Sequence, residues 1–218
     1  MAEYSKVKKW IGNRFGSRII QLMIGAKTEH RFFALYGDFN FGRSFRKKSI
    51  EGLEQESGKV YGAIIYFLES INEQANNVLL AGEDESVKPV YGKILGLELD
   101  KIDTAGVMDG MDYHWDFEYS PPMDKQYSCI VSQSMLEHLI DPYKHVKDCV
   151  SLLENGGVLI VHTMMPGFDY HRYPVDCFRF YPDWFEEVSK RLGVTVKDKQ
   201  IRNSRITYMM QKKAVSDG

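Results

Sequence analysis

The hydrophobic and polar positions of this chain follow two different periods. Apolar residues at steps of three and four predict an amphipathic helix near the N-terminus and a second helix from about Gly58 to Gln74. Further along the chain, short apolar runs predict buried strands that alternate with helices. The predicted strands are 78–81, 101–104, 113–116, 127–131, 158–163, 194–196 and 206–210, and the predicted helices among them are 88–95, 141–153 and 182–192.

This alternation favours a mainly parallel sheet that is covered by helices on both faces. The last two strands are too close in sequence for a crossover helix, so we expect them to pair antiparallel. The predicted class is α/β: a Rossmann-like, doubly wound, seven-stranded sheet with an antiparallel C-terminal hairpin and an N-terminal helical extension. We expect two regions, a basic, aromatic helical or lid segment at 1–55 and the Rossmann domain at 56–218.

The composition is that of an ordinary soluble globular protein, with 44% hydrophobic and 27% charged residues. No apolar run approaches the length of a membrane span, and the start lacks the apolar region of a signal peptide. The three cysteines are too widely spaced for a disulfide framework or a zinc motif. We therefore expect reduced thiols and a cytoplasmic location.

Charge is distributed unevenly along the chain. Residues 1–50 hold 11 Lys/Arg and 3 Asp/Glu, whereas the remainder holds 17 and 27. Such an asymmetry indicates either an anionic partner for the basic segment or a solvated basic face that docks on the acidic domain. The basic N-terminal helix has the composition of a peripheral membrane contact, and equally that of a helix that covers a core.

The candidate chemistry lies where the predicted strand at 127–131 ends. A polar turn with Glu137 and His138 follows it, then a helix, and then the Gly156-Gly157 pair, which we expect to stop that helix. Ligands of doubly wound folds bind beyond the carboxyl ends of the strands. This turn is therefore predicted to line a ligand crevice, although Glu137 and His138 could instead cap the following helix or bond to neighbouring loops.

Three pieces of the chain carry a family resemblance. They are Leu136-Glu137-His138 with Asp141-Pro142, the stretch 153–157, and the stretch 166–181. With them, residues 77–192 resemble the class I S-adenosylmethionine-dependent methyltransferases, in the branch with a Leu-Glu-His turn after the fourth strand. The resemblance implies a methyltransferase that uses S-adenosylmethionine, acts on a small-molecule, sugar or lipid acceptor at oxygen, and needs no metal.

The resemblance also implies which residues bind the cofactor. Asp103 matches the acid at the end of the second strand that binds the ribose hydroxyls, and Asp116 matches the acid at the end of the third strand that binds the adenine amino group. Carboxylates suit both roles because they only accept hydrogen bonds when ionised. Ser132 and Gln133 are expected to face the methionine end of the cofactor.

One motif departs from the family pattern. The glycine-rich turn after the first strand keeps only Gly82 and continues with three acids, Glu83 to Glu85. A negative charge there would repel the methionyl carboxylate unless it pointed to solvent. One of the acids, with Glu83 as our candidate, could instead bind the cofactor's ammonium group.

The expected catalytic residues come from two loops. We predict that His171 or His138 is the base that takes a proton from the acceptor, that Asp176 orients it, and that Arg179 binds an anionic part of the acceptor. An Asp–Arg pair that locks a loop beside a surface histidine explains the same residues. Two rival functions stay open: a non-catalytic methyltransferase-like ligand-binding or scaffold protein, and, ranked third, a nucleic-acid methyltransferase. We expect no nucleic-acid partner because the overall net charge of −2 suits a polyanion poorly.

Overall fold

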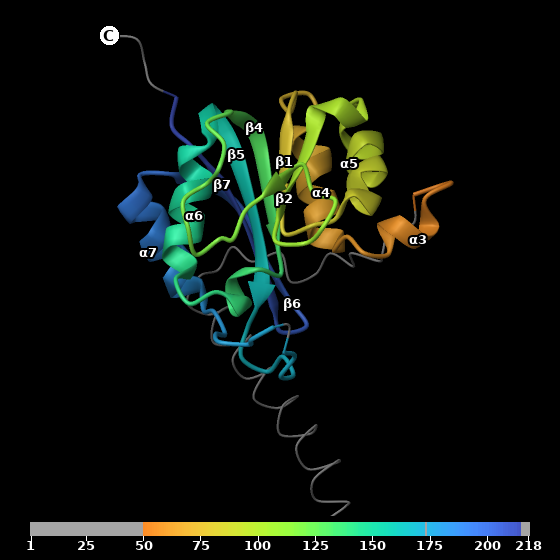
Figure 1. Cartoon of the computed structure of the whole chain (residues 1–218). Coiled ribbons are helices and arrows are strands. Elements are labelled where there is room, and N and C mark those ends of the chain that lie inside the picture. Colours follow the sequence, from red (N-terminus) through yellow and green to blue (C-terminus); the bar gives the residue numbers. More distant parts are fainter. Residues whose placement is uncertain (1–49, 173, 215–218) are drawn as a thin grey trace, which may run out of the picture.

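The computed structural model describes residues 50–172 and 174–214 of the chain (Figure 1). The amphipathic helix and the aromatic stretch predicted before residue 50 lie outside the described residues. The described chain forms one seven-stranded sheet in the order β3-β2-β1-β4-β5-β7-β6, with helices on both faces. None of its helices is long and apolar enough to cross a membrane.

The pairing of the strands confirms the predicted fold class. β1 pairs parallel with β2 and β4, β2 with β3, and β4 with β5, whereas β7 pairs antiparallel with both β5 and β6. The carboxyl ends of all the parallel strands therefore lie at one edge of the sheet. The strands are β1 Val78–Ala81, β2 Ile102–Gly106, β3 Tyr113–His114, β4 Tyr127–Gln133, β5 Leu153–Met164, β6 Thr195–Arg202 and β7 Arg205–Gln211.

Two helices cover each face of the sheet (Figure 1). On one face, α4 (Gly62–Ile71) and α5 (Lys88–Leu95) bury apolar side chains against the central strands, and on the other face α6 (Pro142–Ser151) and α7 (Pro182–Leu192) do the same. Left-handed glycines at 96 and 193 end α5 and α7. The short helices are α3 Glu54–Ser57, η2 Glu85–Val87, η3 Leu99–Lys101 and η4 Leu136–His138.

Several element boundaries differ from the prediction. The helix expected over Gly58–Gln74 is confined to α4, and β2 begins one residue later and ends two residues later than predicted. Gly156-Gly157 does not end α6, which stops at Ser151; the pair lies within β5 instead. Gly156 adopts a φ of +81°, so it allows a sharp change of direction early in that strand.

Replacing Phe185 by alanine should lower the unfolding free energy of the protein, because this side chain packs α7 on the sheet. Phe185 is fully buried and its ring stacks on that of Tyr208 with centroids 4.5 Å apart. Removal of a buried phenylalanine ring costs about 3–5 kcal/mol of unfolding free energy because a cavity remains. Denaturant unfolding measures this loss, and a Tyr119→Ala control, at a side chain that is 70% exposed, should change stability by less than about 0.5 kcal/mol. A small loss for Phe185→Ala would contradict the packing described here.

Candidate functional site

Two glycines form the carboxyl edge of β1 and β2. Gly82 has a φ of +91° and donates its backbone N–H to the carbonyl of Ala105 at 2.8 Å, which ties the two strand ends together. A Cβ on Gly82 would clash with Met135 Sδ, and one on Gly106 would lie 2.7 Å from Met111 Sδ. The two thioether side chains therefore lie directly against bare backbone at this edge. Methionine has three rotatable bonds, so both side chains can move without a change of backbone.

The acidic turn after Gly82 does not present three free charges to this edge. Asp84 caps η2 by accepting a hydrogen bond from the backbone N–H of Ser86 at 2.7 Å, and this bond lowers the pKa of its carboxyl. Glu85 pairs with Lys88 at 3.3 Å and is exposed. Both carboxylates thus have partners within residues 84–88. They therefore repel a negatively charged ligand group at this edge less than the sequence analysis expected.

Glu83 is the acid that turns inward. Its Oε1 accepts a hydrogen bond from Gln133 Nε2, and the same amide group donates to the carbonyl of Lys59 at 3.1 Å. The amide oxygen of Gln133 accepts from the backbone N–H of Tyr61 at 3.0 Å. Burial, together with the negative charge of Asp84, raises the pKa of the Glu83 carboxyl to about 8. The structure brings the predicted residues Gly82, Glu83 and Gln133 together.

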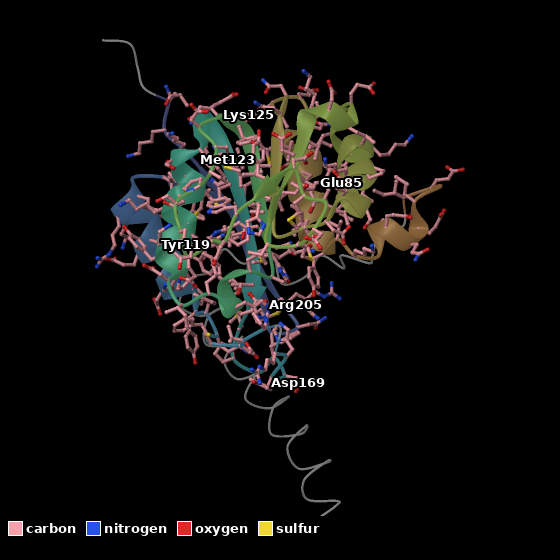
Figure 2. All side chains as sticks on the ribbon, in the orientation of Figure 1. Glu85, Tyr119, Met123, Lys125, Asp169 and Arg205 are labelled. Atoms are coloured by element: carbon pink, nitrogen blue, oxygen red, sulfur yellow. The ribbon has the colours of Figure 1, made fainter. Side chains whose placement is uncertain are left out.

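Asp103 does not lie where the sequence analysis put it. It is the second residue of β2, and its register partner is Leu79, so it lies toward the amino edge of the sheet. Its carboxylate accepts hydrogen bonds from Lys125 Nζ at 2.6 Å and Tyr127 Oη at 2.8 Å. Figure 2 shows Lys125 at the opposite end of the molecule from Arg205 and Asp169. The prediction that Asp103 ends its strand was wrong, because β2 runs two residues further, to Gly106.

Ser132 lies at the carboxyl end of β4, but its side chain turns toward α6. It is the second-last residue of the strand and pairs with Ala81, the last residue of β1. Its side chain is fully buried, with Oγ 2.9 Å from Nε2 of His145 in α6. Burial lowers the pKa of His145 to about 3, so this pair is a neutral contact between the sheet and α6. The hydroxyl of Ser132 therefore does not join the side chain of Gln133 beside Gly82.

Asp116 lies just beyond the third strand, which ends two residues earlier than predicted, at His114. The backbone N–H of Trp115 donates to the carbonyl of Gly106 at 2.9 Å. Asp116 is exposed and accepts a hydrogen bond from the backbone N–H of Glu118 at 3.1 Å. Its carboxylate therefore lies near the end of β2 with capacity to accept further hydrogen bonds.

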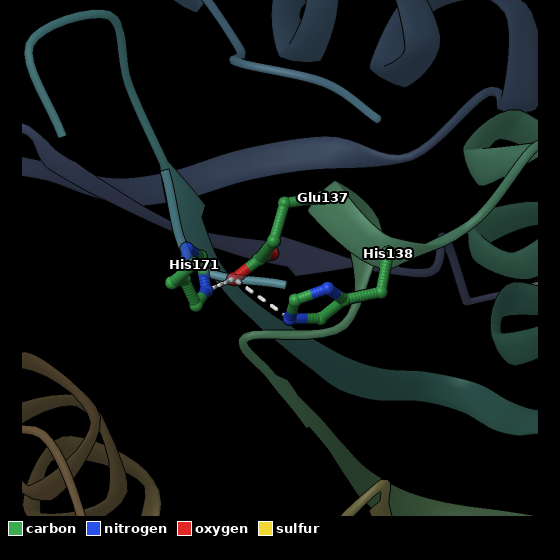
Figure 3. A group of neighbouring side chains, drawn as sticks. All are labelled: Glu137, His138 and His171. Atoms are coloured by element: carbon green, nitrogen blue, oxygen red, sulfur yellow. Dashed lines mark ion pairs between the residues drawn. The ribbon is translucent and has the colours of Figure 1, made fainter. Parts of the chain in front are cut away.

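The carboxyl ends of β4 and β5 carry a cluster of Glu137, His138 and His171, which we call the Glu–His cluster (Figure 3). The Glu137 carboxylate points between the two imidazole rings, with its Oε1 3.9 Å from His138 Nε2 and 3.7 Å from His171 Nε2. Glu137 is completely buried; its Oε2 accepts from Thr163 Oγ1 at 2.6 Å, and its Oε1 has no hydrogen-bond partner in the described chain. The cluster joins two loops that are 33 residues apart in sequence.

Asp176 and Arg179 hold the loop that brings His171 to the cluster. Arg179 donates to both carboxylate oxygens of Asp176 and also to the carbonyl of Asp169 at 3.1 Å. These bonds lower the pKa of Asp176 to about 2. The same carboxylate accepts the backbone N–H of His171 at 2.8 Å and lies 3.6 Å from its Nδ1. The Asp–Arg pair thus locks this loop and positions His171 beside Glu137.

A cavity of about 270 Å³ opens between the start of α4 and the β6–β7 hairpin. His162 lines it, stacked on Tyr61 with ring centroids 4.0 Å apart, and its buried Nε2 has no hydrogen-bond partner in the described chain. Arg205 lies over the rings of Tyr61 and Phe168, at 5.0 and 4.8 Å. Phe168 in turn contacts His171, with centroids 5.1 Å apart, so Arg205 and Phe168 connect the wall of the cavity to the Glu–His cluster.

Sequence reasoning did not foresee several features of this edge. It placed Glu137 in the wall of a ligand crevice, with a helix cap as the alternative, and not at the centre of a cluster. It gave no role to His162 or to the two methionines that lie against the glycines. Only Gly106 carried a signal, since a glycine at the end of an apolar strand is typical of a close backbone approach.

Comparisons with known proteins bear on the fold. No family model matches the chain, and no curated protein matches it. Among solved structures, an S-adenosylmethionine-dependent methyltransferase from Clostridium acetobutylicum is 11% identical, with a TM-score of 0.56 over 87% of this chain and 99% of that one. The sugar N-methyltransferase KedS8 from Streptoalloteichus is 10% identical, with a TM-score of 0.56 over 72% and 89%. The methyltransferase CcbJ from Streptomyces caelestis is 11% identical, with a TM-score of 0.53 over 68% and 94%. Likeness at these identities establishes the fold, which is that of the class I S-adenosylmethionine-dependent methyltransferases.

Proposed function

We propose that the protein is an S-adenosylmethionine-dependent methyltransferase that acts at a hydroxyl oxygen of a small molecule or sugar. The observation that carries the proposal is the meeting of two features at one sheet edge. The bare backbone of Gly82 and Gly106 lies at the ends of β1 and β2, and the Glu–His cluster lies at the ends of the adjacent β4 and β5. Ligands of doubly wound folds bind at this edge.

The residues at the edge fit the cofactor at three points. Gly82 and Gly106 permit a close approach to the backbone once Met135 and Met111 turn aside. Glu83 offers a carboxyl for an ammonium group, and the exposed Asp116 offers acceptors for an amino group. The ribose hydroxyls would meet Gly106 where the family carries an acid.

When bound, the cofactor would supply a methyl group that is attached to a positively charged sulfur. The acceptor oxygen would bond to that methyl group in line with the sulfur, which leaves as a neutral thioether. For such a displacement the main task of the protein is positioning. The acceptor's hydroxyl must also lose its proton, and an imidazole is the usual base near neutral pH. In this proposal His171 or His138 takes that role, with Asp176 and Arg179 holding the His171 loop in place.

The cavity lined by Tyr61, His162 and Arg205 supports a small acceptor. Its volume of about 270 Å³ lies just below the range of about 300–1,000 Å³ for drug-sized ligands. Aromatic faces and an arginine suit a sugar ring or a small anionic group. We therefore favour a small-molecule or sugar acceptor over a lipid, and we retain the cytoplasm as the expected location because the three cysteines are free.

The test is transfer of a labelled methyl group to a panel of hydroxylated small molecules and free sugars. Label should appear as a methyl ether in at least one acceptor, and the yield should fall with the cluster variants.

A second function, ligand binding without turnover, is favoured by one observation: Met135 and Met111 lie in the space that the cofactor needs. Cofactor binding without label transfer to any acceptor, or to water as methanol, would support that second function.

The corrected position of Asp103 yields a prediction of its own. Asp103→Ala should lower the unfolding free energy by about 1–3 kcal/mol, because the hydrogen bonds from Lys125 and Tyr127 are lost. Cofactor affinity should stay within about twofold of the parent protein, since Asp103 lies away from the carboxyl edge. Calorimetric titration and thermal unfolding measure the two effects. A large loss of affinity in a folded variant would restore the role that the sequence analysis gave to Asp103.

A further inference from the structure

The Glu–His cluster contains a buried carboxylate oxygen whose partner is unaccounted for. Glu137 is 0% exposed, and only its Oε2 is hydrogen-bonded, to Thr163. Its Oε1 lacks any hydrogen-bond partner among residues 50–172 and 174–214. Burying a carboxylate without a partner is costly, so such an oxygen calls for a nearby positive charge. Two imidazole Nε2 atoms face it, one on either side (Figure 3), and the charge of Arg179 also acts on this carboxylate.

The three donor atoms are close enough together to approach one cation. Glu137 Oε1 lies 3.7 Å from His171 Nε2 and 3.9 Å from His138 Nε2, and all three atoms lie within 4.8 Å of one another. Around a tetrahedral zinc ion with bonds of about 2.0–2.2 Å, donor atoms are separated by about 3.4 Å. The two distances from Glu137 Oε1 exceed this separation by a few tenths of an ångström, and the two imidazole nitrogens would have to approach each other by up to about 1.4 Å for all three atoms to bind one ion.

The second ring nitrogen of His138 is placed as in metal sites, and that of His171 faces a carboxylate. Metal-binding histidines usually donate the other ring N–H to a carbonyl or a carboxylate, which directs the lone pair at the metal. His138 Nδ1 lies 2.5 Å from the carbonyl of Val175, so it donates there, and the neutral ring then carries its lone pair on Nε2. His171 Nδ1 lies 3.6 Å from Asp176 and makes no hydrogen bond within the described chain, but the same carboxylate accepts the backbone N–H of His171 and is held by Arg179.

We infer that Glu137, His138 and His171 bind one divalent transition-metal cation, such as Zn²⁺, Mn²⁺ or Co²⁺. Two imidazoles with one carboxylate suit these ions, whereas Mg²⁺ and Ca²⁺ prefer all-oxygen sites. Three protein ligands leave coordination positions open, as in catalytic metal sites. The sequence analysis expected no metal, because the ligands come from two loops and form no spaced motif.

The consequence for chemistry rests on the proposed methyl transfer, but the binding does not. A cation here would lower the pKa of an acceptor hydroxyl that reaches it. The O–H bond would then break with its proton passing to solvent, and the oxygen's electron pair would form the new bond to the methyl group as the bond from sulfur to methyl breaks. The two imidazoles would then serve as metal ligands and not as the base. A chelator would therefore abolish methyl transfer if they hold a cation, and would leave it unchanged if one of them is the base.

The test uses the full-length protein, stripped with a chelator, dialysed, and titrated with Zn²⁺ by calorimetry and with Co²⁺ by visible absorption. We expect one ion per chain at micromolar affinity or better, and no comparable heat with Mg²⁺. His138→Ala and His171→Ala should each weaken binding by about 100-fold or more, and Asp176→Asn by about tenfold. His114→Ala, at an exposed histidine on β3, is the matched control and should bind as the parent does.

Because Glu137 is buried, the two histidine variants decide the outcome, with their circular dichroism spectra confirming that they fold. Binding that survives in both variants, or no binding to the parent protein, would overturn the metal site. Neither titration contains cofactor or acceptor. Metal binding without methyl transfer would therefore refute the proposed function alone, and methyl transfer that is unchanged by the chelator would refute the metal's part in the reaction alone.

Discussion

His171→Ala should lower the turnover number for methyl transfer by about 10²–10⁴-fold while the affinity for S-adenosylmethionine stays nearly constant. The imidazole lies 3.7 Å from Glu137 in the Glu–His cluster and contacts Phe168, and it has no hydrogen bond to Glu83 or Gly82 among the described residues. Whether its Nε2 takes the proton or holds a cation, the acceptor hydroxyl loses the group that activates it. Single-turnover rates at saturating acceptor measure the effect.

His114→Ala is the control for this experiment as well, because its side chain is exposed on β3 outside the cluster. His138→Ala is expected to behave like His171→Ala, since both rings face the same carboxylate oxygen. If either variant turns over at the parental rate with saturating acceptor, the corresponding histidine has no part in the chemistry.

In the parent protein, Glu83 should make the unfolding free energy depend on pH by about 2–4 kcal/mol, and the Glu83→Gln variant should lack this dependence. The pKa of the Glu83 carboxyl is about 8 in the folded protein, against 4.5 for an ordinary glutamate, because burial disfavours its charge. Between these two values the folded chain holds a proton that the unfolded chain has lost. The unfolding free energy contributed by this residue therefore falls as the pH rises from about 4.5 to 8 and levels off above 8.

Denaturant unfolding of the parent and of Glu83→Gln across pH 5 to 9 measures this contribution. The variant keeps an oxygen that can accept from Gln133, so the two proteins should be nearly equal in stability at pH 5. At pH 8 the variant should be the more stable one. Parallel curves for the two proteins would mean that Glu83 is ionised throughout this range and is not buried as described.

The fold was predictable because its elements are strongly marked. α5 and α7 each have a proline in their first turn and a glycine at their C-terminal end. Both helices match their predicted bounds. β1 was equally clear as a short apolar run. The end of β2 was not, because Thr104 and Ala105 carry no boundary signal in a strand buried on both faces, and the signal of Gly106 was not used. That slip of two residues moved Asp103 to the wrong edge of the sheet.

The site was predictable only in part, for a related reason. Glu137 and His138 follow a buried strand, so their place at the carboxyl edge could be inferred from pattern alone. His171 lies in a loop with no period, and only the family resemblance placed it there. Its approach to Glu137 depends on the lock between Asp176 and Arg179, and the methionines over Gly82 and Gly106 depend on side-chain packing. Such contacts are tertiary and leave no periodic trace in the sequence.

Calorimetric titration with S-adenosylmethionine and, separately, S-adenosylhomocysteine tests the central claim most directly. The account predicts binding of both at one site per chain with micromolar affinity. It also predicts that Gly82→Val abolishes binding, because a side chain there meets Met135 and fills the approach to the backbone. Failure of the folded parent protein to bind either compound would contradict the account, and the chain would then be a protein of methyltransferase fold that does not use this cofactor.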